Sequence, residues 1–516
     1  MPFREEGHFN FGGGIYRVTS PDDPKFPDNA IFEGLNMVYD KESDNPQTMH
    51  GNTQLGSTAM GGTVTGLFDH NSGDKLLAAA TDGKIYQYDG SDWVAESGAR
   101  ATGNSTVASA RWSGTMFYGA TTTANLSILA NDDPDAPDVP VKFDGSDATT
   151  LGGSPPAAGK FPVAWQGKCW LFQADTAFGS ADENAEEWST GAVNIQIYRG
   201  YDGNITGAAT FGNNLFIFKR SSIFRIAPTD SFSTLSIVKN VSTKVGCVSH
   251  QTIQEDENGL WFESEHGLQR IRQSSGSTGF TIDNMSRWVK PIFDGQNRAV
   301  QNTSFAIYNF DRNEYFFEFA TGSKPTPSRG LIANMATDNR SARWTQFDKQ
   351  NLTCGTMFVE SNTDYNQYVG DTAGKVWLMH DPTKITWNGS VLTSRFQSKY
   401  YVQGLPQHMK RYGWAYANVE SNLTTAVDMR MNLLRRGLPS FGGNVERLAG
   451  LSGSDGWGVG EWGVALWGGS GPAGVRVRPS YAQRGTGMQV LLESDQHFKI
   501  QGVVIASAMR SSKIAA

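Results

Sequence analysis

The side chains that could bind a metal or exchange protons are few and lie far apart in the sequence. Eight histidines occur, and no two have the HxxxH or HxH spacing that lets neighbouring imidazoles reach one metal ion. They are His8, His50, His70, His250, His266, His380, His408 and His497. The three cysteines, Cys169, Cys247 and Cys354, fit neither a disulfide framework nor a zinc site. We therefore predict no metal site, and we interpret the cysteines as buried thiols of a chain folded in a reducing cytoplasm.

Carboxylates are the remaining candidates for chemistry, because glycosidases place a pair of them at the scissile bond. Acidic residues flank several expected strands: Asp89, Asp144, Glu263, Glu265, Glu314 and Asp371. Their spacing pairs no two of them, and acidic residues at turns commonly serve conformation or solubility. The stretch NDDPDAPD at 131–138 offers oxygen ligands to a hard cation, yet it lacks the EF-hand spacing, and its two prolines favour a linker. The sequence thus predicts no catalytic residue, no cofactor and no enzyme.

The elements that carry these residues are repeated β-hairpins. In GNNLFIFKRSSIFRI at 212–226, two alternating apolar segments flank a polar turn at 219–222. Similar segments occur at 75–90, 115–129, 167–175, 258–272, 313–322 and 366–381. We take as equivalent positions Leu77, Phe117, Trp170, Phe216, Trp261, Phe316 and either Phe358 or Val369. Their step of roughly 40 to 55 residues is the size of a four-stranded propeller blade.

We therefore predict an all-β chain whose main part is an irregular β-propeller of about seven blades. A ring of sheets lets each small sheet bury both faces against its neighbours. The competing interpretation is a series of unrelated β-sandwiches, which would show the same alternation without a regular step. Beyond about residue 385 the strands become longer, which predicts an additional C-terminal β-sandwich-like domain. The predicted divisions are an N-terminal arm with the first strands at 1–60, the propeller at 61–385 and the sheet-rich domain at 386–516.

A loop rich in Gly and Trp interrupts the C-terminal strands. It is DGWGVGEWGVALWGGSGP at 455–472, with Trp457, Trp462 and Trp467 spaced every five residues. This spacing fits neither a helix nor a strand. Because tryptophan dominates interface hot spots, the loop is a candidate docking surface. The alternative is a loop that folds back on its own domain and buries the indoles.

Charge and hydropathy exclude some partners. The formal net charge of −7 argues against nucleic-acid affinity through a basic surface. Two basic pairs, Lys219 with Arg220 and Arg435 with Arg436, could contact DNA or a partner, or could be solvated turns. No stretch approaches the roughly 18 apolar residues of a membrane span, and the N-terminus has no apolar core typical of a signal peptide. We expect no stable membrane insertion and a chain that is soluble where it is made.

The order of several motifs resembles a known family. DNAIFEGLNMVYDKESDNPQTMHGNTQLG at 28–56 is followed by LLAAATDGKIYQYDGSDW at 76–93 and by the hairpin at 213–226. VSTKVGCVSHQTI at 241–253, NGLWFESEHGLQRI at 258–271 and MSRWVKPIFDG at 285–295 follow in turn. Over roughly residues 10–380 this succession resembles the tail hub or nozzle (tail tubular) proteins of short-tailed bacteriophages. The Trp/Gly loop and the sheet-rich segment resemble their C-terminal part.

That resemblance implies a structural virion protein, made in the host cytoplasm and located in the virion tail. It implies a ring, typically a homo-hexamer, below the portal and adaptor proteins and beside tail fibres or a tail needle. Genomic double-stranded DNA would be retained and ejected through this ring in transient contact with it. An acidic lumen would repel phosphates and so permit passage.

Two other functions remain open from the sequence. One is a carbohydrate-binding or carbohydrate-cleaving propeller in which Trp170, Trp261 and Trp377 stack on sugars. The other is a protein-interaction propeller of a cell.

Overall fold

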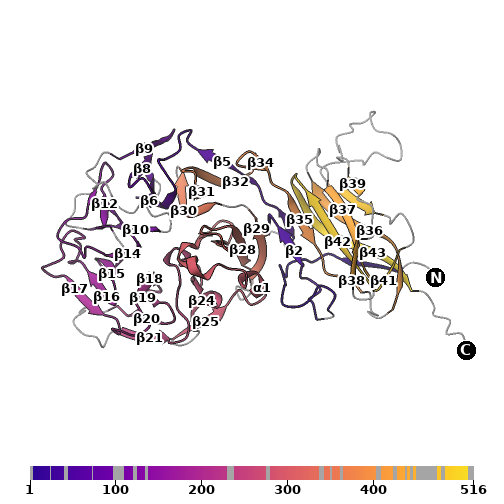
Figure 1. The fold of residues 1–516 in the computed structure, drawn as a ribbon, viewed down its shortest axis with the longest axis horizontal. Coiled ribbons are helices and arrows are strands. Elements are labelled where there is room, and N and C mark those ends of the chain that lie inside the picture. Colours follow the sequence, from indigo (N-terminus) through magenta and orange to yellow (C-terminus); the bar gives the residue numbers. More distant parts are fainter. Residues whose placement is uncertain are drawn as a thin grey trace, which may run out of the picture.

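The computed structural model describes residues 4–509 except 24, 40–44, 72–73, 97–109, 120–124, 134–137, 229–237, 275–278, 336–341, 349–350, 361–363, 403–407, 422–426, 436–437, 442–445, 449–472 and 478–482. These described residues are mostly β-strand, and none of their helices is long and apolar enough to cross a membrane. A ring of small sheets lies beside a second, two-sheet body, which contains the last described strand, β43 (Figure 1).

Seven four-stranded antiparallel units, the blades, form the ring; six are separate sheets, and the four strands of blade 6 belong to a larger sheet. Blade 1 contains β6 (Val64–His70), β7 (Lys75–Ala80), β8 (Ile85–Tyr88) and β9 (Trp93–Ala95), and blade 2 contains β10 (Trp112–Phe117), β11 (Leu126–Asn131), β12 (Val141–Phe143) and β13 (Ala148–Thr150). Blade 3 contains β14 (Lys160–Trp165), β15 (Lys168–Gln173), β16 (Thr176–Gly179) and β17 (Val193–Gln196). Blade 4 contains β18 (Ile205–Phe211), β19 (Asn214–Lys219), β20 (Ile223–Ile226) and β21 (Val238–Ser242). Blade 5 contains β22 (Gln254–Asp256), β23 (Gly259–Ser264), β24 (Gly267–Gln273) and β25 (Phe280–Asn284). Blade 6 contains β26 (Phe305–Asn309), β27 (Glu314–Phe319), β28 (Arg329–Met335) and β29 (Ala342–Phe347). Blade 7 contains β30 (Leu352–Glu360), β31 (Asp364–Asp371), β32 (Val376–Asp381) and β5 (Gly51–Leu55). Short connecting elements are η2 (His250–Thr252), α1 (Lys290–Phe293), η3 (Arg298–Thr303) and the hairpin of β33 (Thr386–Trp387) and β34 (Ser390–Val391).

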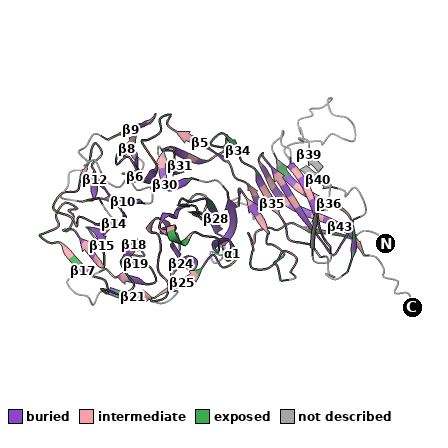
Figure 2. Ribbon diagram, viewed as in Figure 1, coloured by how far each residue is buried: buried purple, intermediate pink, exposed green. Residues whose placement is uncertain are grey.

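The central strands of the blades are apolar on both faces because each blade packs between two others. In β19, Leu215 and Ile217 pack in the cluster shared with blade 3, whereas Phe216 and Phe218 pack in the cluster shared with blade 5. All six residues of β19 are buried. The buried residues in Figure 2 accordingly occupy strands throughout the ring. A strand covered on both sides reads as a continuous apolar run, and only the position of the residue in the run tells which neighbour it meets.

The ring is closed by a strand from near the N-terminus. Strand β5 pairs antiparallel with β32, so that residues 51–55 supply the outermost strand of blade 7. The first strand of blade 7, β30, also lies against β6 of blade 1. Blades 7 and 1 share an apolar cluster that includes Val64, Leu76, Cys354 and Tyr368.

The second body is a β-sandwich built from both ends of the chain. One sheet contains β3 (Met37–Tyr39), β4 (Pro46–Thr48), β43 (Phe498–Met509), β36 (Lys410–Ser421) and β40 (Ala473–Val477), with β1 (Arg4–His8) on β43 and β41 (Gln483–Gly485) on β36. The other contains β2 (Glu33–Leu35), β35 (Ser394–Gln397), β42 (Gly487–Ser494), β37 (Val427–Arg435) and β38 (Leu438–Phe441), with β39 (Glu446–Leu448) on β37.

One sheet runs from the ring into the sandwich without a break. Strand β2 pairs in parallel with β29 of blade 6 through Leu35 and Gln346, and pairs antiparallel with β35 of the sandwich. Blade 6 and the second sandwich sheet are therefore a single ten-stranded sheet. The two bodies are joined by backbone hydrogen bonds as well as by side-chain packing.

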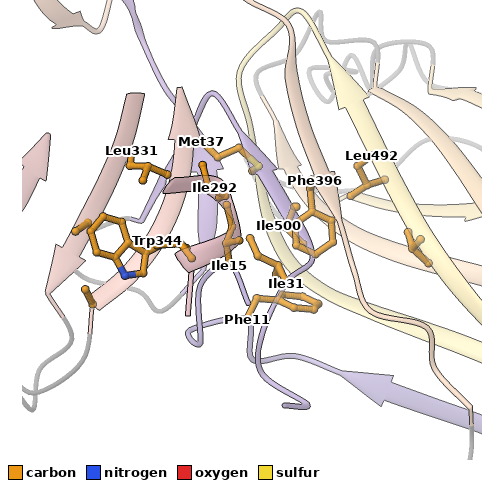
Figure 3. Close-up of a cluster of buried hydrophobic side chains, with 14 of the residues drawn as sticks. Phe11, Ile15, Ile31, Met37, Ile292, Leu331, Trp344, Phe396, Leu492 and Ile500 are labelled. Atoms are coloured by element: carbon orange, nitrogen blue, oxygen red, sulfur yellow. The ribbon is translucent and has the colours of Figure 1, made fainter. Parts of the chain in front are cut away.

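The largest apolar cluster lies across this junction (Figure 3). Trp344 of blade 6 packs in it with Phe396 and Ile500 of the sandwich. The segment before β2 is bonded to blade 6, since the N–H of Ile15 donates to the Trp344 carbonyl at 2.9 Å. Gly14 precedes it with a φ of +67°, and a Cβ there would lie 2.5 Å from the Trp344 nitrogen. Only glycine fits this approach without a shift of the backbone.

The predicted propeller with about seven blades and the additional β-sandwich are confirmed by the strand pairing. The hairpin at 212–226 is β19 and β20. Two proposed positions are wrong: Phe117 and the alternative Phe358 lie in the first strands of their blades. Second strands contain the others: Leu77, Trp170, Phe216, Trp261, Phe316 and Val369. The corresponding strand of blade 2 is β11.

Candidate functional site

A cavity of about 360 Å³ lies on the axis of the ring. The first strands of the blades meet around it, and η2 fills the place between β18 and β26. Its polar lining consists of Ser113, Thr115, Thr210, His250, Gln251, Gln254, Glu255 and Thr356. Hydroxyl and amide groups therefore dominate the polar part of this cavity.

The imidazole in the axial cavity is neutral. Burial lowers the pKa of His250 to about 4. The backbone N–H of Ala208 points to His250 Nδ1 at 3.4 Å, which leaves the ring proton on Nε2. Gln251 crosses to blade 2, where its Nε2 donates to the Trp112 carbonyl at 2.7 Å. Burial and the nearby Asp256 raise the pKa of Glu255. This arrangement can form hydrogen bonds, but its histidine is a poor base.

The acidic residues weighed from the sequence lie away from the axial cavity. Asp89 and Asp144 accept backbone N–H groups of their own turns, from Ser91 and Ser146 at 2.8 and 2.9 Å. Glu265 pairs with Arg220, its Oε1 lying 2.5 Å from the Arg220 Nε. These three acids serve turns and a surface ion pair.

The other three acids are buried and bonded within the blades. Asp371 accepts from the Trp377 indole N–H at 2.9 Å. Glu314 accepts from Arg312 Nε at 3.1 Å. Glu263 accepts from the Gln296 side-chain amide, and burial raises its pKa to about 8. Glu255, which does line the cavity, was missed because it looks like part of the polar turn QEDENG.

The tryptophans suggested as sugar platforms have no open face. Trp170 and Trp261 are 0% exposed and Trp377 is 5% exposed. Trp170 and Trp261 belong to apolar clusters, and Trp261 also stacks on Tyr315 with ring centroids 4.7 Å apart. A sugar cannot stack on an indole that is already covered on both sides. The suggestion that these three residues bind sugars is therefore wrong.

Lys219 is buried, which corrects the expectation that it contacts DNA, a partner or solvent. Its side chain is 0% exposed, and its Nζ donates to Asp175 Oδ1 at 2.8 Å. Two further bonds reach the carbonyls of Tyr198 and Tyr201 at 3.2 and 2.7 Å. The ammonium thus anchors the loop between β17 and β18. Arg220, the next residue, is 54% exposed and remains a surface group.

The remaining predicted positions belong to the C-terminal part of the chain. Trp457, Trp462 and Trp467 lie outside the described residues, as does Arg436. Arg435 is the last residue of β37, where it pairs with Leu438.

The acidic stretch at 131–138 is described only in part. Asn131 Nδ2 donates to Asp138 Oδ2 at 2.6 Å, and Lys160 Nζ donates to the carbonyls of Asp132 and Asp133 at 3.0 and 2.9 Å. In the part of the chain that the structure covers, no group of three or more His, Cys, Asp or Glu is arranged to hold a metal ion.

No family model matches the chain, and no curated protein matches it. Among solved structures, it is similar to the RRP9 WD40 repeats, with 9% identity, a TM-score of 0.41 and coverage of 65% of this chain and 99% of that chain. For U3-55K the identity is 9%, the TM-score 0.40 and the coverage 64% and 98%. It is also similar to the extracellular domain of the BT4673 one-component system of B. thetaiotaomicron, with 12% identity, a TM-score of 0.39 and coverage of 79% of this chain and 46% of that chain. The propeller is defined by its own strand pairing.

Proposed function

We propose that this chain is a structural protein of a bacteriophage tail, a hub or nozzle subunit that assembles into a ring. The order of motifs over roughly residues 10–380 supports the family. Genomic double-stranded DNA would pass through the ring, below the portal and adaptor. The net charge of −7 fits passage better than retention, because acidic walls repel phosphates.

The structural observation that carries the proposal is the ten-stranded sheet shared by ring and sandwich. A subunit of a conduit must keep its two parts in a fixed relation while DNA under pressure moves past it. Domains joined only by a linker move relative to one another. A sheet that crosses the junction resists this motion, because hinge bending would break backbone hydrogen bonds along β2.

The buried groups also favour a structural role over carbohydrate cleavage. The acids weighed from the sequence are used in turns and buried bonds, and the three tryptophans are covered. Cleavage needs two carboxylates facing one bond. The axial cavity is lined by one carboxylate, Glu255, among its described residues.

The mass of the purified protein in solution tests the proposal. Light scattering over a range of concentrations, with negative-stain images of the same samples, should show one closed species of about six copies with a central hole. A closed ring keeps the same mass as concentration rises, whereas an open head-to-tail contact gives filaments of varying length. A monomer at every concentration, or filaments, would count against the ring.

The Trp462→Ala variant tests whether the Trp/Gly loop contributes to assembly. Loss of the ring with an unchanged Tm supports a docking loop, since tryptophan is a frequent hot-spot residue. A lowered Tm with the ring retained supports a loop that packs on its own domain. The exposed Tyr201→Ala variant, at 45% exposure in the ring of blades, is the matched control.

A further inference from the structure

A second and larger cavity, of about 700 Å³, lies between blades 7 and 1. Its lining comes from β5, β30, β31 and β32 on one side and from β7 and β8 on the other. The volume is in the range of small-ligand sites, about 300–1,000 Å³. It lies at the place where the N-terminal strand β5 completes the ring.

The floor of this cavity is apolar and partly aromatic. Phe358 and Tyr368 are buried beneath it, with ring centroids 6.1 Å apart. Leu55, Tyr88 and Leu378 belong to the edge of the same inter-blade cluster and are only half-buried. The apolar cluster between these two blades therefore ends in an open surface instead of a closed one.

The rim carries two amides with fixed orientations. Gln54 Nε2 donates to the Gly56 carbonyl at 2.9 Å, which leaves the Oε1 of Gln54 as an acceptor for a ligand. Gln87 Oε1 accepts from Lys75 Nζ at 3.1 Å, which leaves this amide with its donor nitrogen. One acceptor from blade 7 and one donor from blade 1 suit a ligand whose groups both donate and accept, as hydroxyls do.

The rim carries charges of both signs, and internal hydrogen bonds hold Lys75 and Asp89 in place. Lys75 Nζ also donates to the Gly145 carbonyl at 2.6 Å. Asp89 accepts from the backbone N–H groups of Ser91 and Asp92, each at 2.8 Å. The exposed Asp74 is the remaining carboxylate of the lining. A ligand with a strong charge of either sign therefore meets a like charge as well as an opposite one, whereas a neutral polar ligand meets a carboxylate acceptor and two amides.

We infer that this cavity binds a neutral sugar residue, with its C–H face against the floor around Tyr88 and its hydroxyls on the amides of Gln54 and Gln87. A pyranose has both an apolar face and a polar edge, and the cavity offers the matching pair of surfaces. This site is separate from the tryptophans excluded above. It does not depend on the proposed ring function.

Saturation-transfer NMR and calorimetry on the full chain test the inference. The probes are methyl α-D-glucoside, methyl α-D-galactoside and N-acetylglucosamine, with glucosamine and N-acetylneuraminic acid as cationic and anionic comparisons. We expect saturable binding of at least one neutral sugar and none of comparable strength for the charged pair. Gln54→Ala and Tyr88→Leu should each weaken binding at least tenfold. The matched controls Gln196→Ala and Tyr201→Leu, both exposed and outside the cavity, should leave binding unchanged.

Thermal unfolding of each variant separates lost binding from lost folding. If Tyr88→Leu lowers the Tm, Asp74→Asn provides the second variant, because Asp74 is exposed and lies at the rim. Absence of saturable binding of all three neutral sugars would overturn the inference. So would binding that is equal in the cavity variants and the wild type, or binding of the charged probes alone.

Discussion

Replacing Glu263 by glutamine is expected to flatten the pH dependence of stability in this protein. Glu263 lies in β23, is 0% exposed, and accepts from the Gln296 amide, which is in turn bonded to Gln301 at 3.1 Å. Its second carboxylate oxygen has no hydrogen-bond partner. Burial raises its pKa from the usual 4.5 to about 8. Glutamine preserves the acceptor for Gln296 and cannot ionise.

The magnitude follows from the two pKa values. Between pH 4.5 and 8 the folded state keeps the proton that the unfolded state loses, so stability falls as pH rises through this range. For this group the fall between pH 5 and pH 8 is about 3–4 kcal/mol.

Urea unfolding of the wild type and of Glu263→Gln at both pH values measures this difference directly. The variant should lose less stability than the wild type on going from pH 5 to pH 8. Glu265→Gln is the control, because this neighbour in the same hairpin is on the surface. Equal pH dependence in the wild type and Glu263→Gln would refute the reasoning and show that Glu263 ionises in the folded chain at little cost.

Three further predictions concern other buried groups. Lys219→Met should destabilise the chain by about 3–5 kcal/mol in urea unfolding, because it leaves the Asp175 carboxylate without its buried partner; a loss no larger than for Arg220→Met would contradict this. Burial and the adjacent His497 lower the pKa of His50 to about 4. As pH drops from about 6.5 toward 4, the imidazole is therefore protonated in the unfolded state but not in the folded state, and the free energy of unfolding falls. The urea midpoint of His50→Gln should fall less than that of the wild type between pH 7 and pH 4.5, and parallel curves would argue against it. Burial raises the pKa of all three cysteines, Cys169, Cys247 and Cys354, to about 12. A thiol reagent should therefore modify none of them in the folded chain and all three in urea. Rapid labelling of the folded chain would contradict this prediction.

Local patterns were enough to predict the blades. The hairpin at 212–226 and the repeated second strands carry dense apolar runs, and those runs exist because both faces of a central strand are covered. The prediction that Phe117 is equivalent to the second-strand positions was wrong because the apolar run of blade 2 lies in β11. The first strand of that blade also ends on a buried phenylalanine, Phe117 itself. A regular step identifies the repeat but not the strand within each repeat.

The closing strands could not be predicted in the same way. Strand β5 reads GNTQL and β1 reads REEGH, and neither has apolar alternation. Their place is decided by partners hundreds of residues away, at β32 and β43. A pairing of such sequence separation leaves no local signal.

The candidate sites show the same limit. Lys219 follows an apolar run and precedes RSS, so it reads as the start of a turn, whereas β19 extends to include it. Gln54 and Gln87 look like ordinary outward positions of two strands. They become neighbours of one cavity only when blade 7 is completed beside blade 1. Site residues contributed by separate blades are recognised from the folded chain.

The closing strands also set the order in which the molecule can mature during synthesis. Strand β1 is made before all the other described strands, but it pairs with β43, which is made after all of them. Residues 51–55 similarly wait for β32, which follows six complete blades. Pairings of this range form slowly, and unpaired strand edges are prone to aggregate while they wait. The polar composition of β1 and β5 would keep these early segments soluble until the last strands arrive, so their weak strand signal has a use of its own.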